Sequence, residues 1–113
     1  MARYDRSFAG DLDSLVAQLD AHILRGSLTA SLEESADHRI GDARMVVRVY
    51  ERYSAFGGNR VSLSVSVLAM EGQVAISAIT AGGSRAVLWK INRVGEDQFL
   101  REAVDAIAAA EQR

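Results

Sequence analysis

The 113-residue sequence contains no cysteine and no proline. The lack of cysteine excludes disulfide bonds, thiol catalysis and thiolate metal sites. Neither charge sign is in clear excess, because 13 basic and 15 acidic residues give a formal charge of −2. A nucleic-acid-binding or anionic-membrane-binding surface would need a basic excess, so we expect no nucleic-acid partner.

Long hydrophobic runs are also absent. No apolar stretch approaches the roughly 18 residues needed to cross a bilayer, and the first residues lack the apolar segment of a signal peptide. We therefore expect a cytoplasmic protein with no membrane partner. A hydrophobic fraction of 49% with 25% charged residues is typical of a globular protein, and we expect a single domain over residues 1–113.

The clearest local pattern is the strict alternation of branched apolar residues and serines from Val61 to Val67. Side chains on a strand point to opposite faces with a period of two, so this segment predicts a strand with one buried face and one face of small hydroxyls. Serine is short and a weak strand former. Its presence leaves room for another group to approach this face closely.

The remaining segments predict an antiparallel sheet with two helices. Helical periodicity predicts helices over residues 12–25, capped by Asp11 and ended by Gly26, and over residues 96–111. The order β-α-β-β-β-β-β-α predicts an α+β domain with a single antiparallel sheet of five to six strands and both helices on one face. Alternation and turn residues predict the strands at Arg3–Phe8, Leu28–Glu33, Ala43–Ser54, Arg60–Met70, Gln73–Thr80 and Arg85–Asn92.

Hairpin loops predict the register of this sheet. A two-residue loop at 71–72 pairs Val67 with Ile76, so apolar side chains face apolar side chains. A three-residue loop at 56–58 pairs Val47 with Val67. Both loops therefore predict one inner face of branched apolar residues.

The same register places a group of arginines on the opposite, outer face. Guanidinium groups bind carboxylate or phosphate through two hydrogen bonds, and a phenol with nearby hydroxyls completes an anion site. The alternative is that the arginines pair with acidic side chains of neighbouring strands or of a second subunit. The candidate ligand or interface residues on this face are Arg44, Arg48, Tyr50, Arg52, Ser64, Ser66, Ser77 and Leu88.

Other polar groups do not form a recognisable catalytic or metal-binding pattern. We interpret the segment around His38 as a polar connecting loop. We interpret Gly82-Gly83-Ser84 as a turn, because it lacks the lysine and the following helix of a phosphate-binding loop. The two histidines stand at unrelated spacings, so they predict no metal site. We expect no cofactor and no enzymatic activity.

The order of elements resembles the helix-grip and TBP-like group of α+β folds, in which an antiparallel sheet curls around a C-terminal helix. Members of that group range from lipid-binding domains to nucleic-acid binders, so this resemblance implies shape alone. A more specific resemblance covers nearly the whole chain and rests on Gly26-Ser27, Ala30-Ser31-Leu32-Glu33, Arg48-Val49-Tyr50-Glu51-Arg52-Tyr53-Ser54, Gly57-Gly58-Asn59-Arg60-Val61-Ser62-Leu63 and Ser77-Ala78-Ile79-Thr80-Ala81-Gly82-Gly83-Ser84. In these segments the chain resembles a family of small bacterial proteins catalogued as a domain of unknown function. That resemblance implies no activity and no binding residues.

Three functional hypotheses remain open. The predicted outer face is more apolar than a solvated sheet face, and its small side chains would let a second sheet approach. The first hypothesis is therefore a non-enzymatic, self-associating domain that forms a homo-oligomer, most simply a homodimer, through this face. The second is a binding module for an amphipathic or anionic small molecule. The third is an enzyme, for which no group of residues provides a site.

Overall fold

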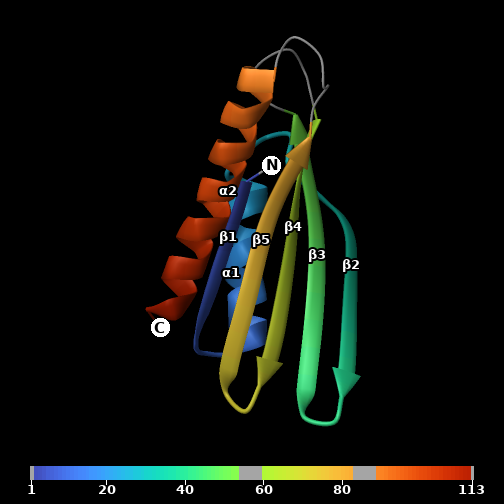
Figure 1. Cartoon of the computed structure of the whole chain (residues 1–113), viewed down its shortest axis with the longest axis vertical. Helices are drawn as coiled ribbons and strands as arrows, with labels where there is room; N and C mark the ends of the chain where they lie inside the picture. The colour runs from blue at the N-terminus through green and yellow to red at the C-terminus, as the bar shows by residue number, and fades with distance from the viewer. Residues whose placement is uncertain (1, 54–59, 83–88, 113) are drawn as a thin grey trace.

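The computed structural model describes residues 2–53, 60–82 and 89–112, without the side chains of residues 89–95. They form two layers, a five-stranded antiparallel sheet and two helices packed on one of its faces (Figure 1). The predicted α+β fold with one antiparallel sheet is confirmed. In chain order the elements are β1 (Ala2–Ala9), α1 (Leu12–Arg25), β2 (Ser31–Ile40), β3 (Ala43–Tyr53), β4 (Arg60–Met70), β5 (Gln73–Gly82) and α2 (Trp89–Glu111).

The strand order in the sheet is β1-β5-β4-β3-β2, so β4 is the central strand and β1 and β2 are the two edges. The alternating segment from Val61 to Val67 lies in β4, with Leu63 and Val65 fully buried. The face that carries these residues and packs against the helices is called the inner face below. The opposite face is called the outer face, and no described helix or strand covers it (Figure 1).

Helix α1 occupies the residues that the sequence predicts, because its ends carry strong local signals. The Asp11 carboxylate accepts a hydrogen bond from the backbone N–H of Ser14 at 2.9 Å, which satisfies one of the free donors of the first turn. At the other end, the Gly26 N–H donates to the carbonyl of His22. The predicted apolar stripe is buried, with Leu15 and Leu19 fully shielded from solvent.

The hairpin between β4 and β5 also has the predicted register. Met70 pairs with Gln73 and Val67 with Ile76. Glu71 and Gly72 both have positive φ, at 52° and 78°, as expected for a tight two-residue turn whose twist matches that of the strands.

The predicted register of β3 is wrong by one residue. The predicted three-residue loop at 56–58 would pair Val67 with Val47, but in the structure Val67 pairs with Val46. The pairing of β3 with β4 begins at Tyr53 and Arg60. The predicted loop itself lies outside the described residues. A shift of one residue moves every side chain of a strand to the other face. The inner face of β3 therefore carries Tyr50 rather than Val47.

The strand β2 also differs from its prediction over Leu28–Glu33. It begins at Ser31 and continues to Ile40, so the segment around His38 is an edge strand and not a loop. Most of its side chains are exposed and polar, and alternation therefore gives no signal there. Charged side chains on an edge strand prevent pairing with a further strand.

The sixth strand predicted over Arg85–Asn92 is not present as predicted. Residues 89–92 form the first turn of α2, while residues 83–88 lie outside the described part of the chain. Short apolar runs do not distinguish a strand from a helix by periodicity alone. The described sheet consequently has five strands.

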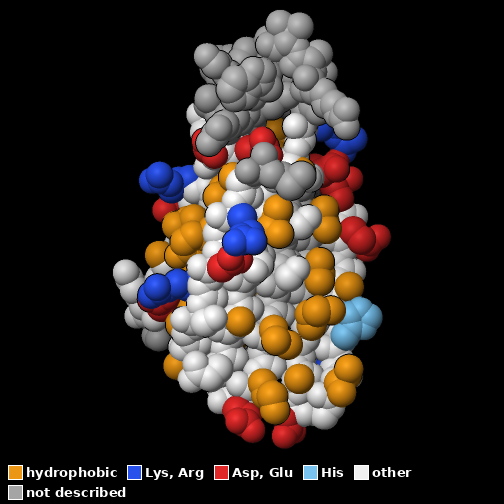
Figure 2. All heavy atoms as spheres, in the orientation of Figure 1, with side chains coloured by type: hydrophobic (Ala, Val, Ile, Leu, Met, Phe, Trp, Pro, Cys, Tyr) orange, Lys and Arg blue, Asp and Glu red, His pale blue; other side chains and the backbone are white. Residues whose placement is uncertain are grey.

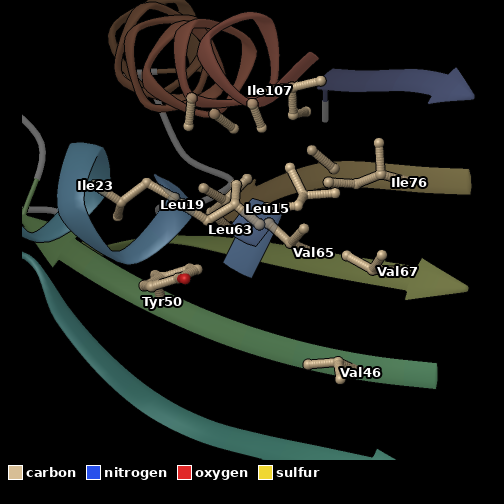
Figure 3. Close-up of a cluster of buried hydrophobic side chains, with 14 of the residues drawn as sticks. Leu15, Leu19, Ile23, Val46, Tyr50, Leu63, Val65, Val67, Ile76 and Ile107 are labelled. Atoms are coloured by element: carbon tan, nitrogen blue, oxygen red, sulfur yellow. The ribbon is translucent and has the colours of Figure 1, made fainter. Parts of the chain in front are cut away.

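The hydrophobic core lies between the helices and the inner face of the sheet (Figure 3). Both helices contribute, and Tyr4 and Phe8 of β1 pack against its edge. Its largest fully buried side chains include Leu15, Leu19, Ile23, Tyr50, Leu63, Val65, Val67, Phe99 and Ile107.

The close approach of β5 to β4 at Gly82 generates a stability prediction. A Cβ atom at Gly82, where φ is 156°, would lie 2.5 Å from the carbonyl oxygen of Arg60 and 2.7 Å from Cα of Val61. We expect Gly82→Ala to lower the free energy of unfolding by about 2–3 kcal/mol in urea titrations. The control is Gly41→Ala, where φ is 56° but no atom lies within 4 Å, with an expected cost of about 1 kcal/mol. Equal losses in the two variants would contradict the predicted clash.

Candidate functional site

The first group of candidate residues lies on the inner face, around Asp20 of α1. The hydroxyl of Tyr50 donates to one oxygen of the Asp20 carboxylate at 2.5 Å, and the Arg48 guanidinium is paired with the other oxygen. Burial and the hydrogen bond to Asp20 raise the pKa of Tyr50 above its usual range. The phenol is thus a fixed hydrogen-bond donor and not a base or nucleophile at neutral pH.

The other two arginines of β3 are paired in the same way. Arg44 binds both carboxylate oxygens of Asp37 on β2, at 3.0 and 2.7 Å, and contacts Asp13 of α1 at 2.9 Å. This cross-strand pair confirms the predicted alternative for Arg44. All three contacts are charge-assisted hydrogen bonds, and the fork geometry with Asp37 is the stronger kind of arginine–carboxylate pair.

Arg52 joins β3 to α2. Its guanidinium donates to Glu102 at 3.0 Å and lies 4.6 Å above the centre of the Phe99 ring. Its side chain is only 9% exposed, so the carboxylate is needed to balance a nearly buried charge. Burial raises the pKa of Glu102, although the Arg52 charge acts in the opposite direction.

The candidate set is therefore divided between the two faces. Arg44, Arg48, Tyr50 and Arg52 were predicted on the outer face, but the register of β3 places all four on the inner face. The predicted location is wrong because the predicted pairing of β3 with β4 is shifted by one residue, which exchanges the two faces of β3. Ser64, Ser66 and Ser77 lie on the outer face as predicted, and Leu88 lies outside the described residues.

A sequence signal for the inward arginines exists on α1. Asp13 and Asp20 are seven residues apart and so lie on one face of the helix, about 10 Å apart along its axis. Arg44 and Arg48 lie about 13 Å apart along one face of a strand. The two spacings match closely enough for each acidic residue to meet one arginine.

The outer face has rows of side chains that run across all five strands, as the observed registers show. It is the face towards the viewer in Figure 2, where exposed apolar side chains gather over the strands and a basic side chain lies beside an acidic one near the middle of the view. From β1 to β2 the three complete central rows are Arg3–Ile79–Ser64–Val49–Glu34, Asp5–Ser77–Ser66–Val47–Ala36 and Ser7–Ala75–Leu68–Met45–His38.

Several apolar side chains on this face are open to solvent. Leu68 is 53% exposed, Met70 49% and Met45 39%, although all three lie on strands well inside the sheet edges. A shallow hollow of about 350 Å³ lies beside Leu68 and Ala75. Contiguous exposed apolar patches are a common feature of interaction sites in soluble proteins.

Met45, Val47 and Val49 lie on the outer face, whereas the register predicted for β3 places them inward. The sequence yields no metal site, and the described residues contain no group of three His, Asp or Glu side chains able to hold one. Neither helix, over the part that the structure describes, is long and apolar enough to cross a membrane.

The Asp20 cluster generates a stability prediction. Asp20→Ala leaves Arg48 and the Tyr50 hydroxyl without their carboxylate partner, and we expect it to lower the free energy of unfolding by about 2 kcal/mol. Asp13→Ala is the matched control, because Asp13 is 72% exposed and Arg44 keeps Asp37. It should cost less than about 1 kcal/mol. Equal costs in urea titrations would show that the Asp20 contacts do not stabilise the fold.

The raised pKa of Glu102 generates a pH prediction. A carboxyl group with a raised pKa binds its proton more tightly in the folded state, so its contribution to stability falls as pH rises above the unfolded value of 4.5. We expect the stability difference between the natural chain and Glu102→Gln to become less favourable to the natural chain between pH 4 and pH 7. Urea titrations at several pH values measure this difference. A difference that grows in favour of Glu102 would contradict the raised pKa.

Comparison with known proteins identifies a family but no activity. No curated protein matches the chain. Among solved structures, the chain is similar to TTHA0849 from Thermus thermophilus, at 8% identity and a TM-score of 0.34 over 96% of this chain and 92% of that one. A likeness of that size carries no argument about function. The model of a family of unknown function, DUF6054, matches residues 1–111, and the chain belongs to that family.

Proposed function

We propose that this chain is a non-enzymatic, self-associating domain that forms a homodimer through the outer face of its sheet. The observation that carries the proposal is the composition of this face. On this face the three middle strands, β3, β4 and β5, present Met45, Val47, Val49, Leu68 and Ile79, together with serines and alanines. No described element covers them.

The size of the face supports a dimer. Five strands spaced about 4.8 Å apart, over the eight residues of β1 at about 3.4 Å each, give a face of about 650 Å². A stable interface of standard size buries roughly 800 Å² per partner, whereas crystal contacts bury less than about 400 Å² per partner. The outer face is therefore close to the area that a specific dimer needs.

The distribution of charge also supports self-association. The charged or titratable residues in the three complete rows lie on the edge strands, as Arg3 and Asp5 on β1 and Glu34 and His38 on β2. The three middle strands carry no basic side chain on this face over positions 45–51, 62–70 and 73–81. Their charged residues on this face, Glu51 and Arg60, form an ion pair at the end of the sheet where β4 begins. Protein interfaces have this arrangement, with few charges in the centre and a polar rim.

The alternative of an anion-binding module receives less support. Arg44, Arg48 and Arg52 each pair with a carboxylate of the same chain. An anionic ligand would have to displace Asp37, Asp20 or Glu102 from these contacts. The outer face, in turn, has no cation near its centre to hold an anion, over the middle-strand positions given above.

The proposal is tested by placing a charge at the centre of the outer face. We expect the natural chain to be a dimer by light scattering at tens of micromolar and Leu68→Arg to be a monomer, because the new guanidinium would be desolvated in the interface. The matched control is Leu28→Arg, which adds the same charge at a position that is 106% exposed and lies in the segment between α1 and β2, outside the strands of the outer face. It should remain a dimer.

The outcomes separate the hypotheses clearly. A natural chain that is monomeric at these concentrations would contradict the proposed function. A dimer that both arginine variants leave intact would show that self-association uses a different surface. Circular dichroism should show the same fold in both variants, since Leu68 is already half-exposed.

A further inference from the structure

We infer that the two copies pack with their two-fold axis parallel to β4, so that each row of the outer face lies opposite the same row of the other copy in reverse order. This inference rests on the proposed homodimer and specifies its geometry. Because β4 has two strands on either side, a two-fold axis along β4 lets the two five-stranded faces overlap completely. Rotation about β4 places β5 opposite β3 of the second copy and β1 opposite β2.

The sizes of the facing side chains agree with this arrangement. In reversed rows, Ala75 lies opposite Met45 of the second copy, and Ser77 lies opposite Val47. In these two rows the larger side chain of β3 meets a small one of β5, and in the third row Ile79 meets Val49 in an apolar contact. The hollow of about 350 Å³ beside Ala75 and Leu68 provides space for the methionine side chain.

The axis itself runs along the serines of β4. Ser64 and Ser66 lie opposite their own copies, and their small side chains allow the central strands to approach closely. Leu68, the next residue of β4 on the outer face, lies opposite Leu68 of the second copy. This arrangement accounts for serine on the exposed side of the most regular strand.

Charges at the edges are also complementary in reversed rows. Arg3 lies opposite Glu34 of the second copy, and the symmetry repeats the pair at the other edge. Asp5 already has two partners, Arg3 at 3.2 Å and the Ser77 hydroxyl at 2.5 Å. Glu34 accepts a hydrogen bond from the backbone N–H of Ser35 at 3.0 Å but forms no ion pair with any described residue. The dimer supplies the cation that Glu34 lacks.

The distances between two packed sheets permit this contact. Sheets pack about 10 Å apart, and a crossing angle of about 30° shifts residues at the edges by about 5 Å. An extended arginine and a glutamate together span such a separation. Both side chains lie at the solvent boundary, where an ion pair contributes more to specificity than to affinity.

A two-fold axis perpendicular to the strands fits less well. If that axis passes through the row of Ser66, Asp5 lies opposite Asp5 of the second copy, which is repulsive. If it passes between the rows of Ser64 and Ser66, Arg3 meets Asp5 but Glu34 faces Ala36. Neither arrangement gives Glu34 a cation.

Charge reversal tests the edge contact. We expect Arg3→Glu and Glu34→Arg each to raise the dimer dissociation constant by about tenfold, because each creates two like-charge contacts. The double variant should restore most of the loss. If the double variant instead loses as much dimer affinity as the two single variants added together, Arg3 does not pair with Glu34. That result would leave the proposed dimer itself intact.

Cross-linking tests the position of the axis directly. Because the natural chain has no cysteine, an introduced cysteine is the only thiol that can react. The variants are Ser7→Cys on β1 and His38→Cys on β2, which share one row and are both exposed or half-exposed. With the axis along β4, residues on opposite edges lie about 10 Å apart, whereas equivalent edge residues lie about 20 Å apart. We expect a short bis-maleimide to cross-link a mixture of the two variants and neither variant alone.

Each other outcome of the cross-linking overturns a defined part of the account. Cross-linking of either variant with itself would reject an axis along β4. The axis would also be rejected if light scattering shows a dimer but the mixture gives no cross-link. A chain that is monomeric by light scattering and gives no cross-link would reject the proposed function as well.

Discussion

The structure depends on the pairing of the β3 arginines with carboxylates of the helices. Asp20 receives hydrogen bonds from both Arg48 and Tyr50, and Arg52 meets Glu102 over the ring of Phe99. These contacts hold β3 with its arginine side chains towards the helices and fix its register against β4. A shift by one residue would expose Tyr50 and separate the arginines from their carboxylates. The cost of leaving nearly buried charges unpaired makes that alternative unfavourable.

This constraint determines what the outer face can do. Because the arginines of β3 are used inside, the outward positions of that strand carry Met45, Val47 and Val49. Together with the serines of β4 they form a surface with a small, weakly polar centre and charged edges. The same register that stabilises the monomer therefore creates the surface on which we base the proposed homodimer.

Local signals predicted much of the fold but only part of the site. Helix α1 was predicted to the residue, because Asp11 and Gly26 mark its ends, and the β4–β5 hairpin was predicted because its two-residue turn allows one register. The register of β3 was not predictable in this way, since both of its faces mix apolar and charged residues and the loop before β4 gives no fixed parity. Its true register depends on contacts with α1 and α2 that are distant in sequence, and the exposed edge strand β2 has no apolar alternation to mark it.

Isotope-filtered nuclear Overhauser spectroscopy on a dimer of one methyl-labelled and one unlabelled copy tests the account most directly. It reports which methyl groups of one copy lie near protons of the other. We predict intermolecular signals at Leu68, Val49 and Ile79, on the outer face, and none at Leu15 or Leu63 in the core. Intermolecular signals confined to the helices, or none under conditions where the chain is dimeric, would contradict the central claim that the outer face is the interface.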